Sequence, residues 1–139
     1  MQDHDRIELA MKPGSRHEIR RGPISTTQLV KYAGASGDFN RIHFDQPFAM
    51  QAGLGGVVVH GMLTMGFAAS CVNEHVRELA DVDEISARFL APLKAGDVVD
   101  LSSTVVQVDG RTLHMELLAV SDGRTVMSGK ARAVLRSGA

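Results

Sequence analysis

Residues 57–79 read VVVHGMLTMGFAASCVNEHVREL, and in a helix the part from 62 to 72 would be hydrophobic on nearly every side. The pattern becomes amphipathic only toward Leu79. A helix that is apolar all round has to be covered by other parts of the protein. We therefore expect a long central helix that starts at Gly61 and is buried by the rest of the chain.

The sequence that follows this helix predicts the covering layer. Leu113, Met115 and Leu117 alternate with more polar residues, so they share one face of a strand. Turn signals KAGD, DG and SDG separate four strand candidates at residues 86–93, 97–108, 111–120 and 125–135. Residues 16–25 can add a fifth strand, so we predict an α+β domain with a curled antiparallel sheet wrapped around the central helix.

A short helix is predicted ahead of the central one. Ser25 and Gln28 have the spacing of a capping box, which satisfies the free amides at a helix start. An apolar face follows, and Gly34 is placed to end the helix. We expect it to span residues 26–33.

A polar loop, GDFNRIHFD at residues 37–45, comes next. Asp45 is suited to cap a second short helix, which has a proline in its first turn and which Gly53 is placed to end. The loop would then join two short helices. The residues of the second helix that we expect to face the core are Phe48, Ala49 and Ala52.

Composition limits the classes of function. The chain has 139 residues, 44% hydrophobic and 22% charged, with a formal net charge of −1. These values are ordinary for one globular domain, which we place over residues 1–139 with a flexible segment at 1–15, and they favour neither nucleic acid nor an anionic membrane as partner. The polar N-terminal stretch and the lack of a long apolar run predict a cytoplasmic protein. Cys71 is the only cysteine and is expected to be a buried thiol.

The polar loop also holds groups suited to catalysis. Asp38 and His43 are five positions apart, so a loop that turns back can bring both to one water molecule as a general acid/base pair. Gly61 would supply an unpaired amide at the positive end of the central helix, where an oxyanion can be stabilised. These parts suit the addition of water to a double bond conjugated with a carbonyl, and they also suit ester or thioester hydrolysis.

Two segments resemble a known family at this point. YAGASGDFNRIHFD at 32–45 and GLGGVVVHGMLTMGF at 53–67 look like the MaoC-like, R-specific enoyl thioester hydratases and dehydratases of the hot-dog fold, including dehydratase subunits of type II fatty-acid synthesis. ARFLAPLKAGD at 87–97 is also similar to the family's strand and turn after the central helix. The likeness covers about residues 20–135.

By this resemblance Asp38 and His43 fall on the family's catalytic pair, and Gly61 falls on the glycine whose amide binds the thioester oxygen. Asn40 would order the loop. His60 and Met62 are candidate supporting or substrate-binding residues beside it.

The resemblance further implies a reversible hydration of trans-2-enoyl thioesters to (3R)-hydroxyacyl thioesters, without metal or other cofactor. The implied partners are an acyl thioester of coenzyme A or acyl carrier protein and a second hot-dog subunit. That subunit could be a second copy or a different chain, and the cleft would lie at the interface.

One residue departs from the family pattern. The family commonly has proline after the loop asparagine, whereas this chain has Arg41, so the loop loses a restraint on φ. Arg41 could act on Asp38 through its charge, contact a phosphate of the substrate, or point into solvent, and we favour solvent.

Three other interpretations compete with a hydratase. A hot-dog thioesterase usually carries its carboxylate on the central helix, where the first acid of this chain is Glu74. A subunit that only binds an acyl thioester would need neither Asp38 nor His43. A metal site of Asp38, His43 and His60 has suitable ligand types but lacks a recognised metal-binding spacing.

Overall fold

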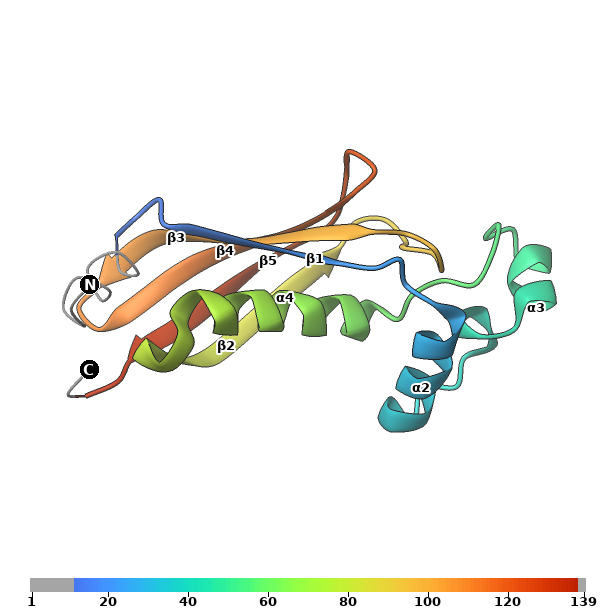
Figure 1. Ribbon diagram of the computed structural model, residues 1–139, viewed down its shortest axis with the longest axis horizontal. Helices are drawn as coiled ribbons and strands as arrows, with labels where there is room; N and C mark the ends of the chain where they lie inside the picture. The colour runs from blue at the N-terminus through green and yellow to red at the C-terminus, as the bar shows by residue number, and fades with distance from the viewer. Residues whose placement is uncertain (1–11, 138–139) are drawn as a thin grey trace.

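The computed structural model describes residues 12–137, in which one antiparallel sheet carries a long helix along its face (Figure 1). The helix is α4 (Gly61–Val76). Within these residues the strands are β1 (Arg16–Arg21), β2 (Ala80–Phe89), β3 (Val99–Asp109), β4 (Thr112–Ser121) and β5 (Arg124–Leu135), in the spatial order β1-β3-β4-β5-β2. The predicted α+β class and the sheet around a central helix are confirmed.

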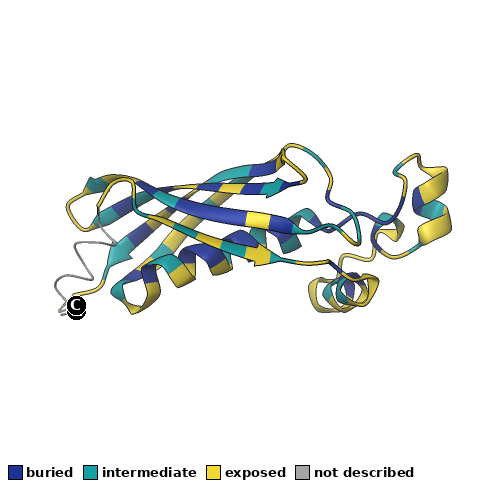
Figure 2. Cartoon of the chain, turned by 45° about the horizontal axis from the view of Figure 1, so that its top comes forward, coloured by how far each residue is buried: buried dark blue, intermediate teal, exposed yellow. Residues whose placement is uncertain are grey.

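The central helix is buried on one side only. Its buried residues are Thr64, Phe67, Ala68, Cys71, Val72 and Val76, which lie against the inner face of the sheet (Figure 2). On the opposite side Met62 is 59% exposed. The expectation that the chain covers this helix all round is therefore wrong, because the sheet reaches only one side of it.

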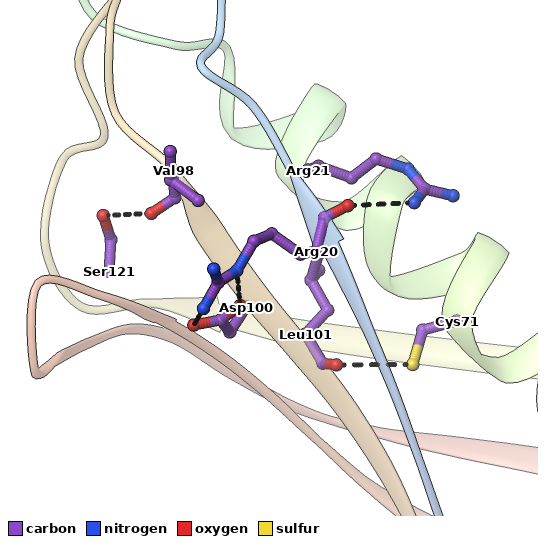
Figure 3. Close-up of polar contacts among 7 residues, drawn as sticks. All are labelled: Arg20, Arg21, Cys71, Val98, Asp100, Leu101 and Ser121. Atoms are coloured by element: carbon purple, nitrogen blue, oxygen red, sulfur yellow. Dashed lines mark hydrogen bonds and ion pairs between the residues drawn. The ribbon is translucent and has the colours of Figure 1, made fainter.

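Cys71 is the buried thiol that its apolar neighbours predict. It is fully buried, and its sulfur points from α4 toward the carbonyl oxygen of Leu101 on β3, 3.7 Å away (Figure 3). Burial raises the pKa of this thiol.

On the neighbouring edge strand, β1, Arg20 forms an ion pair of 2.7 Å with Asp100 of β3, which lies opposite it in the register.

The short elements lie together beyond one end of the sheet, next to the start of α4 (Figure 1). They are α2 (Thr26–Ser36), a 3₁₀ turn (Arg41–His43) and α3 (Gln46–Gln51). The Ser25 hydroxyl accepts from the Gln28 amide over 3.0 Å, so the predicted cap is confirmed. The end of α2 was predicted too early: the helix passes through Gly34 and stops at Gly37, which has a φ of 78°.

The cap of α3 is also as predicted. A carboxylate oxygen of Asp45 accepts from the Phe48 amide over 3.1 Å. Ala49 is fully buried, but Ala52 is exposed, so its expected place in the core is wrong. The helix ends at Gln51 and Ala52 already lies beyond it.

The strand after α4 starts earlier than the sequence pattern suggests. β2 begins at Ala80, not at residue 86, and its register against β5 shifts between Val82 and Glu84. That irregularity adds a residue to the strand and hides the period-two alternation.

The N-terminal segment expected to be flexible, residues 1–15, lies partly outside the described residues, which begin at 12. Within the described part, Gly14 donates to the carbonyl of Val105 over 2.7 Å, and Val105 donates to the carbonyl of Ser15 over 2.9 Å. Across residues 12–137, no helix is both long enough and apolar enough to span a bilayer.

Candidate active site

The loop after α2 is held by its own polar side chains. One carboxylate oxygen of Asp38, Oδ1, accepts from the Asn40 amide over 3.2 Å, and the Asn40 side chain accepts from the Ile42 amide over 3.2 Å. Asn40 thereby caps the 3₁₀ turn that carries His43. The arrangement leaves the second oxygen of Asp38, Oδ2, to face the histidine.

His43 is fixed by a hydrogen bond to the segment that precedes α4. Its Nδ1 lies 2.7 Å from the carbonyl oxygen of Val58. Because a carbonyl only accepts, Nδ1 carries the proton, and the lone pair of neutral His43 is on Nε2. Nε2 lies 3.7 Å from Oδ2 of Asp38, too far for a direct hydrogen bond, so the two atoms can share a water molecule at their side. His43 itself is only 8% exposed.

Gly61 begins α4 a short distance from this pair. Its amide is at the helix start, and among the described residues it has no hydrogen-bond acceptor. A Cβ at this position would lie 3.1–3.3 Å from ring carbons of Phe89, so a larger residue here would require the ring to shift. The Cα of Gly61 thus faces an aromatic ring from the end of β2.

A pocket of about 430 Å³ brings the histidine and the glycine together. Its lining includes His43, Gly61, Thr64, Phe89 and Leu93. Of the other residues predicted for the site, Asp38, Asn40, His60 and Met62 are not part of this lining. A hollow of about 500 Å³ over β2, β4 and β5 contains none of the predicted residues.

His60 lies next to Asp38 and His43. It is 1% exposed, its ring stacks on that of His43 with 3.7 Å between centroids and 18° between planes, and its Nε2 donates to the backbone carbonyl of Asp38 over 3.2 Å. Burial is the main cause that lowers the pKa of His60, so the ring is neutral near pH 7. His60 therefore contacts both residues of the pair.

The same three side chains fit a metal ion poorly. Ligand atoms of Asp38, His43 and His60 lie within 4.8 Å of one another. However, the two imidazoles are stacked nearly parallel, so their lone pairs do not converge on one point. In addition, one nitrogen of each ring is engaged with a backbone carbonyl.

Arg41 does not project freely into solvent as we expected. Its side chain is 60% exposed, but Nη2 lies 2.8 Å from the carboxylate of Asp45, and the guanidinium lies 4.3 Å from the centre of the Phe48 ring. The Arg41 hydrogen bond is the main cause that lowers the pKa of Asp45. Arg41 thus ties the loop that carries His43 to α3.

The carboxylate that a thioesterase would use is far from this site. Glu74 lies thirteen positions after Gly61 on α4, which corresponds to about 20 Å along the helix axis. Its side chain is 53% exposed and its neighbour is His17 on β1, at 3.8 Å. The geometry therefore gives no support to a carboxylate on the helix acting at this pocket.

Sequence reasoning missed three residues that shape the site. Phe89 lies directly against Gly61 in the pocket lining, Val58 orients His43, and Tyr32 packs edge-on against His60 with 4.7 Å between centroids. The apolar run before His60 offered a weak signal for Val58. No local pattern indicated Phe89, because its contact spans 28 residues of chain.

Comparisons with known proteins show which proteins the chain is similar to. Residues 9–126 match the family model described as the MaoC like domain. The chain is 30% identical over 115 residues to the peroxisomal multifunctional enzyme type 2 of Mus musculus, covering 79% of this chain but only 15% of that protein. It is 28% identical over 117 residues to the 3-hydroxybutyryl-CoA dehydratase of Methylorubrum extorquens, covering 82% of this chain and 74% of that one.

The fold is shared with solved structures. The structure of the (R)-hydratase from A. caviae superposes with a TM-score of 0.84 over 90% of this chain and 97% of that chain, at 20% identity. At that identity the likeness establishes the hot-dog fold, which confirms the predicted fold class.

Proposed function

The chain belongs to the MaoC-like domain family, and from this membership we propose that it catalyses the reversible hydration of trans-2-enoyl thioesters to (3R)-hydroxyacyl thioesters. One observation carries the proposal. Nε2 of His43 faces Oδ2 of Asp38 at 3.7 Å, beside a pocket that is lined by both His43 and Gly61, and the Gly61 amide has no acceptor among the described residues. The candidate base, His43, and the candidate oxyanion donor, the Gly61 amide, thus belong to residues that line the same pocket.

In the proposed reaction the Asp38–His43 pair takes a proton from a bound water, and the resulting hydroxide adds to C3 of the substrate. The electron pair of the double bond moves toward the thioester oxygen, where the Gly61 amide and the positive end of α4 stabilise the enolate. A proton returned from the pair to C2 completes the product. Dehydration is the same path in reverse, and neither direction needs an oxidant, a reductant or a cofactor.

We also propose that the substrate is carried on coenzyme A or acyl carrier protein and that a second hot-dog subunit completes the cleft. β2 is an edge strand, and Phe89 and Leu90 at its end are 49% and 51% exposed beside the pocket. Edge strands are often guarded by free charges. Here Asp81 and Asp83 are paired with Arg136 and Arg132 of the same chain, at 2.6 and 3.0 Å, which supports pairing of this edge with another subunit.

The experiment uses purified protein with crotonyl-CoA and with a longer trans-2-enoyl-CoA. Loss of the conjugated double bond, product chirality and free thiol are recorded together, for wild type and for folded Asp38→Asn and His43→Gln variants. A (3R)-hydroxyacyl product that both variants fail to form supports the hydratase. Release of free thiol instead would indicate a thioesterase, and binding without turnover would indicate a subunit that only binds the thioester.

Oligomeric state is measured separately by light scattering on the eluting protein. A dimer mass is expected if the second subunit is another copy. A monomer that gains turnover only with an added partner chain would indicate a heterodimer.

A further inference from the structure

Three aromatic rings from three separate segments pack in a row, and the last of them is His43 of the proposed catalytic pair. Tyr32 of α2 packs edge-on against His60 with 4.7 Å between centroids, and His60 stacks face-on against His43 at 3.7 Å. His60 and His43 are 1% and 8% exposed, so the stack is shielded from water. The ring contacts of His60 are with Tyr32 and His43, and its contact with Asp38 is through the backbone carbonyl of that residue.

His60 is itself held in a fixed place. Its backbone forms the N-cap of α4, where its carbonyl accepts from the amides of Leu63 and Thr64 at 3.0 and 3.3 Å. Its ring donates from Nε2 to the carbonyl of Asp38 over 3.2 Å. The residue therefore links the helix start, where the Gly61 amide lies, to both members of the catalytic pair.

The other ring nitrogen of His60 indicates that this residue does more than fill space. Nδ1 is buried and has no hydrogen-bond partner. Buried polar atoms without partners are uncommon and require an explanation. Phenylalanine would fill the same space without this unpaired nitrogen, but it could not donate to Asp38.

We propose that His60 is a positioning residue, which holds Asp38 and His43 in the relative orientation that activates water; this rests on the proposed hydratase function. The stack prevents the His43 ring from turning away from Val58, so Nε2 stays directed at Asp38. The hydrogen bond to the Asp38 carbonyl fixes the backbone from which the carboxylate extends. The two contacts are separable by substitution.

The test compares His60→Ala, His60→Phe and His60→Gln, with His75→Ala as a control at a partly buried histidine of α4 that bonds Ser103 instead. Turnover of crotonyl-CoA gives kcat and KM. Proton NMR follows the Nδ1–H of His43, whose 2.7 Å bond to Val58 protects it from exchange with water. The signal is identified by its loss in His43→Gln, and thermal unfolding verifies that each variant is folded.

In His60→Ala we expect kcat to fall at least about tenfold, which is part of the rate that a general base contributes. We expect KM to change less than about twofold. The protected proton should vanish in His60→Ala and His60→Gln but persist in His60→Phe, which keeps an aromatic ring in the stack. His60→Phe should keep its thermal stability, because the new ring fills the same space and removes a buried nitrogen that has no partner, yet it should lose kcat through the freed loop. His75→Ala should match wild type in kcat and in the protected proton.

A folded His60→Ala protein with wild-type kcat and a persistent proton would overturn the proposal. If His60→Ala does not fold, the remaining two variants decide, and equal behaviour of the His43 proton in His60→Phe and His60→Gln contradicts it. Wild-type protein that hydrates neither crotonyl-CoA nor a longer enoyl-CoA would refute the proposed function. The NMR comparison would still show whether His60 holds His43.

Discussion

His43 Nδ1 donates to the carbonyl oxygen of Val58 over 2.7 Å, so one edge of the imidazole ring is fixed while the other faces Asp38. The two ring nitrogens have different tasks, which substitutions can separate. The side-chain amide of asparagine reaches the position of Nδ1, whereas that of glutamine reaches the position of Nε2. This difference leads to the first prediction.

We predict that His43→Asn keeps the bond to Val58 and is the more stable of the two variants, whereas His43→Gln leaves the buried carbonyl unpaired. The cost for the glutamine variant should be about 1–3 kcal/mol of unfolding free energy. Both variants should lose roughly 10²–10⁴-fold in kcat, because neither amide is a base. Urea unfolding and turnover on an enoyl-CoA measure the two effects, and equal stabilities of the two variants would contradict the role of Val58.

The second prediction concerns Arg41, which ties the loop to α3 through Asp45. The pKa of Asp45 is lowered mainly by the Arg41 hydrogen bond, so the ionised carboxylate is favoured in the folded state. Its stabilising effect is present above the ordinary carboxylate pKa of about 4 and is lost as the pH falls through the lower folded value. Arg41→Ala should therefore weaken the acid dependence of unfolding between about pH 4 and 2, where carboxylates titrate.

At neutral pH the same variant should lose little stability, because the Arg41 side chain is 60% exposed and solvent screens its charge. Its kcat should fall several-fold as the loop loosens. Arg41→Lys is the matched control, since it keeps the charge but not the forked guanidinium. Unfolding curves at pH 7, 4 and 3 give the comparison, and identical pH profiles for wild type and Arg41→Ala would contradict the prediction.

The third prediction concerns the contact between Gly61 and Phe89. A Cβ at position 61 would lie 3.1–3.3 Å from the Phe89 ring, which must then move. Phe89 is 49% exposed and can shift, so we expect Gly61→Ala to cost less than about 1 kcal/mol in stability, at the low end for an overpacked site. Activity should fall more, because the displaced ring enters the pocket where the thioester oxygen would lie.

Phe89→Leu in the same chain supplies the control. The double variant should regain activity relative to Gly61→Ala alone, because the smaller side chain relieves the contact. The two effects on kcat/KM should therefore be non-additive. Simple additivity would show that the alanine acts through something other than Phe89.

What could be predicted from the sequence depends on how far apart the interacting residues are. The caps formed by Ser25 and Asp45 are local and were predicted correctly, as was the alternation of Leu113, Met115 and Leu117. The start of β2 was missed because the register shift after Val82 breaks its alternation. The local sequence pattern does not predict such a register shift.

In the candidate site, too, contacts between residues near in sequence could be predicted and contacts between distant segments could not. Asp38 and His43 are near each other in sequence, so one loop explains how their facing atoms come within 3.7 Å. The ring stack of His43 and His60, and the contact of Phe89 with Gly61, depend on how the segment before α4 and the end of β2 meet. Those positions follow from the curvature of the whole sheet, which a single sequence does not specify residue by residue.

The last prediction tests that curvature at Gly129, where β5 pairs with Ala87 of β2 and Leu117 of β4. A Cβ at position 129 would collide with the backbone carbonyl oxygen of Ser86 and would lie 3.4 Å from the Cα of Ala87. Backbone cannot move aside as a flexible side chain can. Gly129→Ala should therefore cost about 3 kcal/mol of unfolding free energy, the upper part of the range for overpacking.

Gly34→Ala is the matched control for this substitution. Gly34 lies within α2, and a Cβ there meets nothing within 4 Å. Alanine should stabilise the helix by about 0.5–1 kcal/mol, because it has less backbone freedom to lose on folding. Urea unfolding of both variants gives the comparison. Opposite signs would show that the strands need glycine at 129 for close approach, whereas a neutral Gly129→Ala would mean that β2 and β5 can separate locally without loss of the fold.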